Sequence, residues 1–319
     1  MADSVSKNKL SEEKIRELAE IAFPEREVSS IEELTAGLCN ALYVVTMTDG
    51  FKTVLKVSSP GMVGKTSNEQ WLIESETAAM RLVAEHVPSV PAPKVLFYDD
   101  SMTRCSGKYF FMEYMDGELM MPLRRTLTKE RARALYSAMG RAVRDIGTIK
   151  NDTFGIVNSG IGFDSLYGVV NQLIGNMTGD MERCGADMGV TRDEILAQLL
   201  ADKPYFDEVT EASLVHFDIW ENNILVCGDE ITGIVDWERA LWAEPLMEDR
   251  FRWYGIHPDF LEGFGQTEFS KSEQRRLTWY NLWITLAFMG EHFTRQYDTE
   301  EDYRNNRAAM LKFWEKLKK

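Results

Sequence analysis

The chain has 319 residues, of which 44% are hydrophobic and 27% are charged, and these values are typical of a globular protein that buries a sizeable core. Its formal net charge is −15 at pH 7, and so acidic a surface repels phosphate backbones and anionic lipid headgroups. We therefore expect neither a nucleic acid nor a membrane as a partner.

The cysteines indicate the compartment. Cys39, Cys105, Cys184 and Cys227 lie far apart and form no Cys-x-x-Cys pair. This spacing fits neither a zinc knuckle nor a disulfide framework, and it favours the cytoplasm. The polar start of the chain and its short apolar runs predict no signal peptide and no membrane-spanning helix, which would need about 20 apolar residues.

The chain begins with a predicted helix and a hairpin. Apolar residues at helical spacing predict a helix over 11–23. Two runs rich in β-forming residues, 41–48 and 51–58, are joined by Asp49-Gly50. This dipeptide between such runs is among the strongest short-range signals for a hairpin.

A long helix and two further strands complete this first region. Ser67-Asn68-Glu69-Gln70 has the pattern of a capping box and predicts a helix from there to about His86. Short β-rich runs at 94–98 and 109–113 predict two strands around a polar turn. We expect this small, antiparallel, β-rich lobe to comprise residues 1–115.

Beyond residue 115 the sequence is mainly helical. A helix over 128–146 is closed by Gly147, and a second capping box at Thr191 starts another helix. Short apolar runs interrupt this pattern once, at 214–217, 224–226 and 231–235, and the helical pattern resumes from 242 to 319. The sequence thus predicts an α+β fold of two lobes, with a larger, mainly helical lobe over 116–319.

The sharpest motif lies among these short runs. His216, Asp218 and Asn223 fit the pattern H-x-D-x-x-x-x-N, and Asp236 follows at the end of an apolar strand. An isolated Asp at the end of a strand is usually a turn former. Together with the motif upstream, however, Asp236 is a candidate member of the same reactive site.

Phosphoryl transfer explains why these residue types occur together. A nucleoside triphosphate needs Mg²⁺ held by oxygen ligands, and the acceptor hydroxyl needs a carboxylate that orients it and takes its proton. Asn223 and Asp236 are the candidate metal ligands, and Asp218 is the candidate base. We expect His216 to brace the loop by hydrogen bonding, since the carboxylate is the better-placed base.

A cation for the phosphates is expected from the first lobe. Lys56 is a single cation within an apolar strand, and Glu76 shares a helix face with apolar neighbours. A carboxylate from an adjacent helix can hold a lysine that points at the phosphates. Glu74 and Glu69 remain candidates for the same role.

The turn between residues 34 and 41 is a candidate phosphate loop. It contains Gly37, Asn40 and several small residues, so its backbone N–H groups can approach phosphates. It lacks the spacing of a glycine-rich G-x-G-x-x-G loop, and a hairpin turn without a ligand has the same composition.

The order of these features resembles the aminoglycoside phosphotransferase and choline kinase group within the protein-kinase-like fold. The resemblance covers about residues 30 to 290 and includes Met112-Glu113-Tyr114-Met115-Asp116-Gly117 after the last strand. The H-F-D sequence, D-W-E in place of D-F-G and the lack of an A-P-E segment are similar to small-molecule kinases rather than protein kinases. Many members of the group have Gly where this chain has Phe217.

The resemblance implies a role for each matching residue. It implies Asp218 as the catalytic base, Lys56 with Glu76 as the phosphate-binding pair, and the backbone of Glu113 and Met115 as adenine contacts. Asn223 and Asp236 are implied as magnesium ligands. The cofactors implied are Mg²⁺ and ATP or GTP as co-substrate.

The acceptor site is the part of the protein that the sequence determines least. Acidic and aromatic residues of the second lobe suit a cationic amine through ion pairing and cation–π contact, although aromatic residues at helical spacing are more often core. The candidates are Trp237, Glu238, Trp279, Tyr280, Trp283 and Glu291.

Several functions stay open at this point. We expect a monomeric or homodimeric kinase whose acceptor is an antibiotic such as an aminoglycoside or a macrolide. The alternatives are a metabolite kinase acting on choline, a sugar amine or an amino alcohol, a catalytically silent nucleotide-binding module, and, more weakly, a protein kinase.

Overall fold

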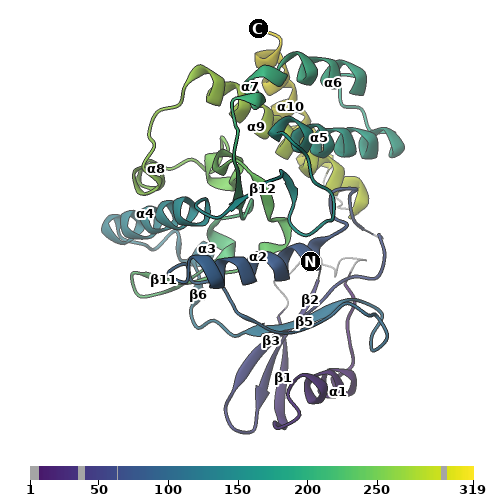
Figure 1. The fold of residues 1–319 in the computed structure, drawn as a ribbon, viewed down its shortest axis with the longest axis vertical. Coiled ribbons are helices and arrows are strands. Elements are labelled where there is room, and N and C mark those ends of the chain that lie inside the picture. Colours follow the sequence, from purple (N-terminus) through teal and green to yellow (C-terminus); the bar gives the residue numbers. More distant parts are fainter. Residues whose placement is uncertain (1–6, 35–39, 63, 296–299) are drawn as a thin grey trace.

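The computed structural model describes residues 7–34, 40–62, 64–295 and 300–319. Two lobes are stacked along its long axis (Figure 1), a smaller one built on a sheet and a larger one that is mainly helical. The chain passes from one to the other after β5 (Tyr109–Glu113), because the next strand, β6 (Glu118–Leu119), pairs with β10 (Ile224–Cys227) of the larger lobe.

The smaller lobe contains an antiparallel five-stranded sheet in the order β1-β2-β3-β5-β4. The expected hairpin is present, and the strand before it begins at Val28. The expected first helix, α1, packs beside the sheet (Figure 1), and α2 lies between the sheet and the larger lobe. Besides β5, the bounds of these elements are α1 Glu12–Ala22, β1 Val28–Leu34, β2 Ala41–Met47, β3 Lys52–Val57, α2 Leu72–His86 and β4 Val95–Asp99.

Alternation along β3 assigns its side chains to two faces. Leu55 and Val57 pack with Leu18 of α1 in one apolar cluster, whereas Val54 packs with the residues of α2 in the main core. Because successive strand residues point to opposite faces, Lys56 shares the face of Val54. This strand therefore directs its lysine toward α2 and the space between the lobes.

The capping box expected at Ser67 is wrong. The helix begins at Leu72, and the backbone N–H and hydroxyl of Ser67 both donate to the Asp180 carboxylate of α5 (Leu166–Arg183), at 2.7 Å and 2.6 Å. Glu69 instead accepts hydrogen bonds from Thr66. A tertiary contact therefore uses the groups that would have capped a helix, and residues 66–70 lie against the larger lobe.

The larger lobe is built mainly from helices, and the caps expected at Thr128 and Thr191 are both present. The interruption expected in the helical pattern contains the strands β9, β10 and β11. Besides α5, the helices of four or more residues are α3 Met120–Leu123, α4 Lys129–Ile146, α6 Arg192–Ala201, α7 Lys203–Asp207, α8 Pro258–Phe264, α9 Lys271–Thr294 and α10 Glu300–Leu317.

Two small sheets carry the loops of this lobe, and they contain more strands than the sequence indicated. One sheet has the order β11-β10-β6 and the other β7-β9-β12-β8. The strands missed are two or three residues long, too short to show a period of two. Besides β6 and β10, the bounds are β7 Lys150–Asn151, β8 Gly155–Ile156, β9 Ala212–Val215, β11 Glu230–Ile234 and β12 Leu241–Ala243.

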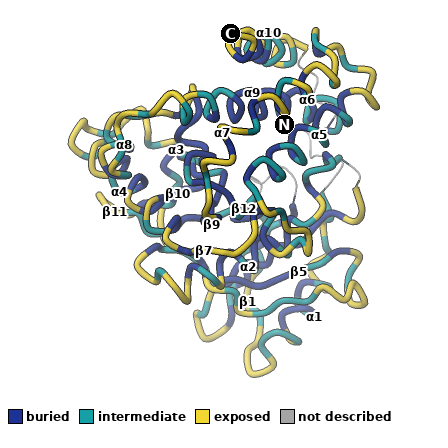
Figure 2. The backbone as a smooth tube through the Cα atoms, turned by 45° about the horizontal axis from the view of Figure 1, so that its top comes forward, coloured by how far each residue is buried: buried dark blue, intermediate teal, exposed yellow. Residues whose placement is uncertain are grey.

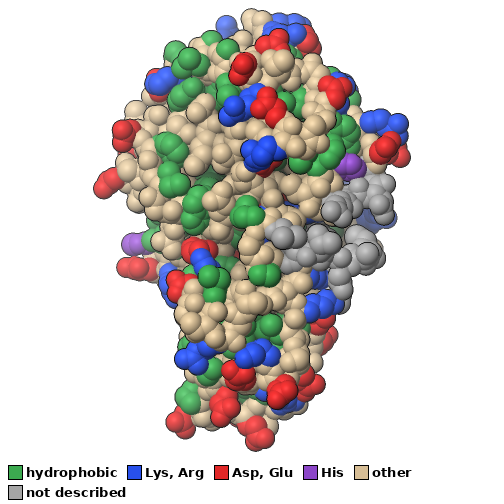
Figure 3. Space-filling model, turned by 90° about the vertical axis from the view of Figure 1, so that its right-hand side faces the viewer, with side chains coloured by type: hydrophobic (Ala, Val, Ile, Leu, Met, Phe, Trp, Pro, Cys, Tyr) green, Lys and Arg blue, Asp and Glu red, His purple; other side chains and the backbone are tan. Residues whose placement is uncertain are grey.

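The buried residues form two cores. Figure 2 shows buried backbone along α9, α5, β9 and β12 of the larger lobe and along the sheet of the smaller one. On the face in Figure 3, outside the grey residues, acidic and basic side chains are interspersed. Across the described ranges, no helix is both long enough and apolar enough to span a membrane.

Candidate active site

A cavity of about 420 Å³ lies between the two lobes. This volume is within the range of small-molecule binding sites, about 300–1,000 Å³. Gly37 lies outside the described residues, and His216 sits behind the cavity wall. The other candidate residues of the catalytic, metal and nucleotide sites all line the cavity, namely Asn40, Lys56, Glu76, Glu113, Met115, Asp218, Asn223 and Asp236.

Lys56 is the centre of a buried ion cluster in this cavity. Its Nζ lies 2.6 Å from Glu76 Oε2, 2.8 Å from Asp236 Oδ1 and 3.0 Å from Glu238 Oε2. Its ammonium group donates a hydrogen bond to Asp236, and the carboxyl groups of Glu76 and Glu238 lie close enough to form ion pairs with it. Asn40 Nδ2 donates to the same Glu238 oxygen at 2.6 Å, which joins the end of the candidate phosphate loop to the cluster.

The cluster contains three carboxyl groups for one ammonium group. Burial raises the pKa of Glu76 to about 8, although Lys56 opposes this shift. Burial alone would lower the pKa of Lys56, but the carboxylates of Asp236, Glu238 and Glu76 outweigh burial and hold this pKa well above its ordinary value. A proton on Glu76 therefore offsets part of the excess of acidic groups at pH 7.

Glu74 and Glu69, the two other candidates for pairing with Lys56, pair with other cations instead. Glu74 forms an ion pair with Lys108, and Glu69 Oε1 lies 2.6 Å from Arg295 Nη2. Two positions along an α-helix rotate a side chain by about 200°, so Glu74 and Glu76 leave α2 in opposite directions.

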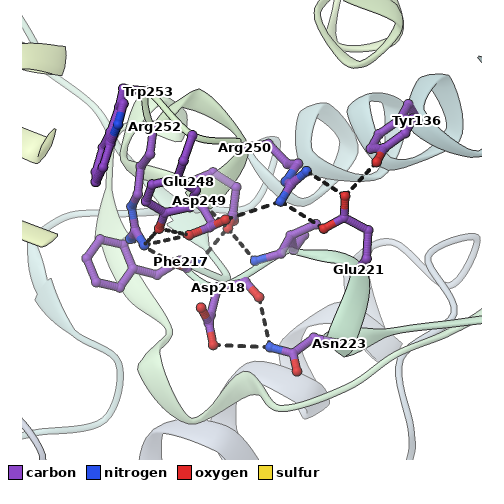
Figure 4. Close-up of polar contacts among 12 residues, drawn as sticks. Tyr136, Phe217, Asp218, Glu221, Asn223, Glu248, Asp249, Arg250, Arg252 and Trp253 are labelled. Atoms are coloured by element: carbon purple, nitrogen blue, oxygen red, sulfur yellow. Dashed lines mark hydrogen bonds and ion pairs between the residues drawn. The ribbon is translucent and has the colours of Figure 1, made fainter. Parts of the chain in front are cut away.

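The loop after β9 holds Asp218 and Asn223 together. Asn223 Nδ2 donates to the carbonyl oxygen of Asp218 at 2.9 Å and to its Oδ2 at 3.1 Å (Figure 4). Burial and the carboxylates of Asp249 and Asp236 raise the pKa of Asp218 against the opposing effect of Arg239. A carboxylate with a raised pKa is a stronger base than an ordinary one.

His216 connects this loop to the strand that ends at Asp236. The backbone N–H of Asp218 donates to His216 Nδ1 at 3.2 Å, and His216 Nε2 lies 3.0 Å from the carbonyl oxygen of Val235. Because Nδ1 accepts, the ring proton is on Nε2 and is donated to that carbonyl. Burial lowers the pKa of His216 to about 4, so the ring is neutral at pH 7.

We expect this buried histidine to make folding stability fall with acid. The neutral ring is favoured in the folded state, so stability present above pH 6.5 is lost as the pH falls toward 4, by about 2 kcal/mol between pH 7 and 5. Urea unfolding at the two pH values measures this difference, which should shrink by that amount in His216→Gln. The exposed His86→Gln is the control, and an equal change in both variants would contradict the prediction.

A carboxylate that the sequence analysis missed anchors the same loop. Glu248 Oε2 accepts from the backbone N–H of Phe217 at 3.0 Å, and its Oε1 accepts from that of Ile219 at 2.7 Å. Arg252 Nη2 donates to the carbonyl oxygen of Phe217 at 3.0 Å. These bonds fix the backbone on both sides of Asp218 (Figure 4). No motif marks Glu248, because only the fold brings it to the loop.

The loop has a strained backbone at Phe217. Its φ is 75°, a left-handed conformation that a bulky residue rarely adopts. The Arg252 guanidinium lies 4.8 Å from the ring centroid of Phe217. The ring centroids of Phe217 and Trp283 are also 4.8 Å apart. These contacts, with the hydrogen bonds of Glu248 and Arg252, offset the strain.

The carboxylates around Lys56 and the amide oxygen of Asn223 are suitable ligands for a divalent cation. Carboxylate oxygens of Glu76, Asp236 and Glu238 lie within 4.8 Å of one another, and the side chain of Asp236 is 40% exposed to the cavity. Asn223 uses its amide nitrogen on Asp218, which leaves its amide oxygen for a cation. Carboxylate and amide oxygens are the donors that Mg²⁺ prefers.

The opposite end of the cavity is mostly apolar. Glu113 donates its backbone N–H to the carbonyl oxygen of Lys94 at 2.9 Å, so that its carbonyl group is what it can offer a ligand. Met115 lies two residues further along the cavity wall. The apolar lining comes from both lobes, from Leu34, Leu42, Val54, Pro93, Met112, Leu119, Leu225 and Val235.

The aromatic candidates for the acceptor site divide into two groups. Trp279 Nε1 donates to Asp202 Oδ2 at 2.7 Å, Tyr280 donates to Glu244, and Trp237 Nε1 donates to the carbonyl oxygen of Ile234 at 2.8 Å. All three are buried core residues, so their candidacy for the acceptor site is wrong. Helical spacing alone did not distinguish them from residues that face a cavity.

The three other candidates line cavities. Trp283, Glu238 and Glu291 surround a second cavity of about 40 Å³, on the far side of Glu238 and Arg239 from the larger one. Phe217 lines it as well, so this second cavity begins one residue from Asp218.

Comparison with known proteins relates this geometry to a family. A family model described as the phosphotransferase enzyme family matches residues 30–249. No curated protein matches the sequence.

Solved structures similar to this chain carry the same kind of name. A ternary complex of a thermostable mutant of aminoglycoside phosphotransferase APH(4)-Ia with ADP and hygromycin B is 16% identical, with a TM-score of 0.64 over 94% of this chain and 97% of that one. A candidate aminoglycoside phosphotransferase from Ralstonia eutropha JMP134 is 13% identical, with a TM-score of 0.65 over 97% and 99%. The streptomycin–ATP complex of APH(2")-IIa is 14% identical, with a TM-score of 0.61 over 95% and 97%.

At these identities the similarity establishes the fold. The two-lobed, α+β, protein-kinase-like fold expected from the sequence, with an antiparallel sheet in the first lobe and helices in the second, is confirmed.

Proposed function

Because the chain belongs to the phosphotransferase enzyme family and is a small-molecule kinase, we propose that it transfers the γ-phosphoryl group of ATP or GTP to a hydroxyl group of a small molecule, as a monomer or homodimer in the cytoplasm. Residues 1–115 would form the nucleotide-binding lobe, and residues 116–319 the lobe with the catalytic loop and the acceptor site. The meeting of Lys56, Glu76 and Asp236 in the cavity that Asp218 and Asn223 also line is the observation that supports this proposal most strongly.

The nucleotide would lie along the larger cavity. Its base would contact the carbonyl group of Glu113 and the N–H of Met115 between the apolar walls, and Lys56 would bind its phosphates, with Gly37 and Asn40 in the loop that covers them. Lys56 donates a hydrogen bond to Asp236 and lies within 3.0 Å of Glu76 and Glu238, so a phosphate that binds it would displace one of these carboxylates. Asp236 is the one most accessible to solvent, at 40% against 0% for Glu76.

Asp218 would act on the acceptor. As the acceptor oxygen forms its bond to the γ-phosphorus, the bond from that phosphorus to the bridging oxygen of ADP breaks, and the hydroxyl proton goes to the Asp218 carboxylate. Asn223 donates to this carboxylate, and Glu248 and His216 hold the backbone around it by accepting from the N–H groups of Ile219 and Asp218. Such positioning accounts for much of the rate gain in phosphoryl transfer, because the transition state is loose.

Magnesium is the cofactor that the donor set fits. Asp236 and the amide oxygen of Asn223 would hold it. Bound there, the ion would neutralise the charge of the phosphates during transfer.

We expect Asp236→Asn to weaken nucleotide binding only when magnesium is present. The variant removes a metal ligand, so the affinity for Mg²⁺·AMP-PNP should fall by about tenfold or more. Calorimetric titration with Mg²⁺ and then with EDTA measures this. An equal loss of affinity under both conditions would contradict the assignment of Asp236 to the metal.

The family and the solved relatives support two acceptor classes as candidates. Antibiotics such as aminoglycosides and macrolides are the first class to test, and metabolites such as choline, sugar amines and amino alcohols are the second. Magnesium-dependent release of ADP or GDP, measured with both panels in one coupled assay, should rise above basal hydrolysis with members of one class. Tight nucleotide binding without turnover on any acceptor would instead indicate a silent module.

A further inference from the structure

The loop that carries Asp218 and Asn223 contains a buried carboxylate between them. Glu221 begins the 3₁₀ turn that ends at Asn223. Trp220 and Asn223, on either side of it, line the nucleotide cavity. Glu221 itself is only 2% exposed, and its side chain is directed toward α4 rather than toward Asp218 (Figure 4). It therefore contacts the interior of the larger lobe behind the loop.

Three hydrogen bonds hold the Glu221 carboxylate. The hydroxyl of Tyr136 in α4 donates to Oε1 at 2.5 Å. Arg250, which is also buried, donates through Nη1 to Oε1 at 3.2 Å and through Nη2 to Oε2 at 3.1 Å. A two-pronged contact between a guanidinium and a carboxylate fixes the orientation of the two groups as well as their distance. The position of the turn therefore depends on α4 and on Arg250.

The chain segment around Arg250 contacts the other half of the loop as well. Glu248 and Arg252 bind the backbone on both sides of Asp218 by the hydrogen bonds described above. Arg250 lies between these two residues in the chain. One segment of five residues, 248–252, thus contacts the backbone beside the proposed base and the turn that carries the proposed metal ligand. The distance between base and metal ligand depends on it.

A buried ion pair of this kind contributes more to position than to stability. Two charges that leave water lose hydration, and this loss offsets much of their attraction, so that apolar side chains of similar size often stabilise a fold equally well. The hydrogen bonds of the pair are nevertheless directional. What the pair gives the loop is a defined position, and position is what the groups around a reacting phosphate need most.

The larger lobe contains a second cluster of the same three residue types. Glu244 accepts from Arg276 Nε at 2.7 Å and from its Nη2 at 3.1 Å, and it also accepts from the hydroxyl of Tyr280. All three residues are buried. None of them lines the nucleotide cavity or the smaller one beside it. This cluster therefore shows what such a group contributes to stability alone.

On the basis of the proposed function, on which this inference rests, we propose that Glu221 and Arg250 are positioning residues for phosphoryl transfer. Their ion pair holds the turn so that the amide nitrogen of Asn223 stays on Asp218 and its amide oxygen stays available to magnesium. Without the pair the turn can move. A displacement of about 1 Å in a reacting group can lower a rate by about 100-fold.

A double variant at each cluster tests this role. Glu221→Gln with Arg250→Met removes both charges of the loop pair, and Glu244→Gln with Arg276→Met is the matched control. Calorimetry should show an affinity for Mg²⁺·AMP-PNP that is about tenfold lower in the loop variant, because residues that hold a metal ligand affect metal binding by this much. Its affinity for AMP-PNP in EDTA, and both affinities of the control, should match the wild type within about twofold. With an acceptor found in the coupled assay, kcat of the loop variant should fall by about 10- to 100-fold at nearly constant acceptor KM.

A milder pair of variants serves if a double variant does not fold. Tyr136→Phe and Tyr280→Phe each remove one hydroxyl donor from a buried glutamate and leave its arginine in place. Urea unfolding should show similar losses of stability in the two. Tyr136→Phe should also lower the affinity for Mg²⁺·AMP-PNP by about threefold, whereas Tyr280→Phe should leave this affinity unchanged.

The outcomes separate this inference from the proposed function. Equal effects of the loop and control variants on the affinity for Mg²⁺·AMP-PNP would overturn the inference, because both clusters would then be structural. An equal loss of affinity with Mg²⁺ and with EDTA in the loop variant would overturn it as well. A wild-type protein that binds AMP-PNP no better with Mg²⁺ than with EDTA would instead contradict the proposed function itself.

Discussion

Asp218→Asn is expected to lower turnover by about 10³- to 10⁴-fold while nucleotide affinity changes little, because a positioned base contributes this much to proton transfer. The amide has nearly the shape of the carboxylate and can still contact Asn223, so the loop should keep its conformation. It cannot take the hydroxyl proton. Initial rates with an identified acceptor, together with calorimetry of Mg²⁺·AMP-PNP, measure the two effects separately.

The control for this variant is Asp229→Asn. Asp229 lies in the turn between β10 and β11, where its side chain is 74% exposed and pairs with Arg131, and a surface ion pair contributes little to stability. Its turnover should match that of the wild type. Near-normal activity of Asp218→Asn on the same acceptor would show that another group accepts the proton.

Lys56→Met is expected to abolish nucleotide binding and to destabilise the fold. The variant leaves Glu76, which is fully buried, beside Asp236 and Glu238 without their shared cation. Removal of one partner of a buried ion pair costs about 3–5 kcal/mol. Urea unfolding measures this loss, and calorimetry measures the affinity for Mg²⁺·AMP-PNP.

The pH dependence of this variant has a defined sign. Burial raises the pKa of Glu76 in the folded state to about 8, so the stability associated with its protonated form is complete below the unfolded pKa near 4.5 and is lost as the pH rises through 8. Loss of Lys56 removes the group that lowers this pKa. Both proteins keep Glu76 protonated below about pH 8, so the difference in stability between variant and wild type should grow above that pH and be larger at pH 9 than at pH 7.

A double variant separates the two roles of Lys56. Lys56→Met with Glu76→Gln removes a cation and a carboxyl charge together, so it should regain part of the lost stability but none of the nucleotide affinity. Lys52→Met, at the exposed start of the same strand, should change neither property. Recovery of nucleotide binding in the double variant would mean that Lys56 acts on Glu76 rather than on phosphate.

The sequence predicted the strands of the smaller lobe well because their signals are local. Asp49-Gly50 determined the hairpin, whereas the face of β3 that carries Lys56 was decided by the packing of the two cores. The start of α2 was misplaced, because Ser67 binds Asp180, 113 residues away in the chain. The shortest strands were missed since two or three residues cannot show a period.

The sequence likewise revealed part of the candidate site, namely the residues that belong to motifs. The motif with Asp218 and Asn223 and the later Asp236 are visible in the sequence, because each follows a short apolar strand. Glu248 carries no such signal, although it bonds to the backbone on both sides of Asp218. The burial of Trp279 and Tyr280 was equally hidden, because their partners come from Asp202 and Glu244.

The sequence by itself determined which chemical groups are present and in what order, since hairpins, caps and strand alternation depend on residues a few positions apart. The tertiary structure alone decided that Glu76, rather than Glu69 or Glu74, pairs with Lys56. It also decided which carboxylates line the cavity and can bind a ligand. Those outcomes depend on where α2 begins and on how the lobes approach each other. Ion pairing and desolvation act between side chains that are close in space, whatever their separation along the chain.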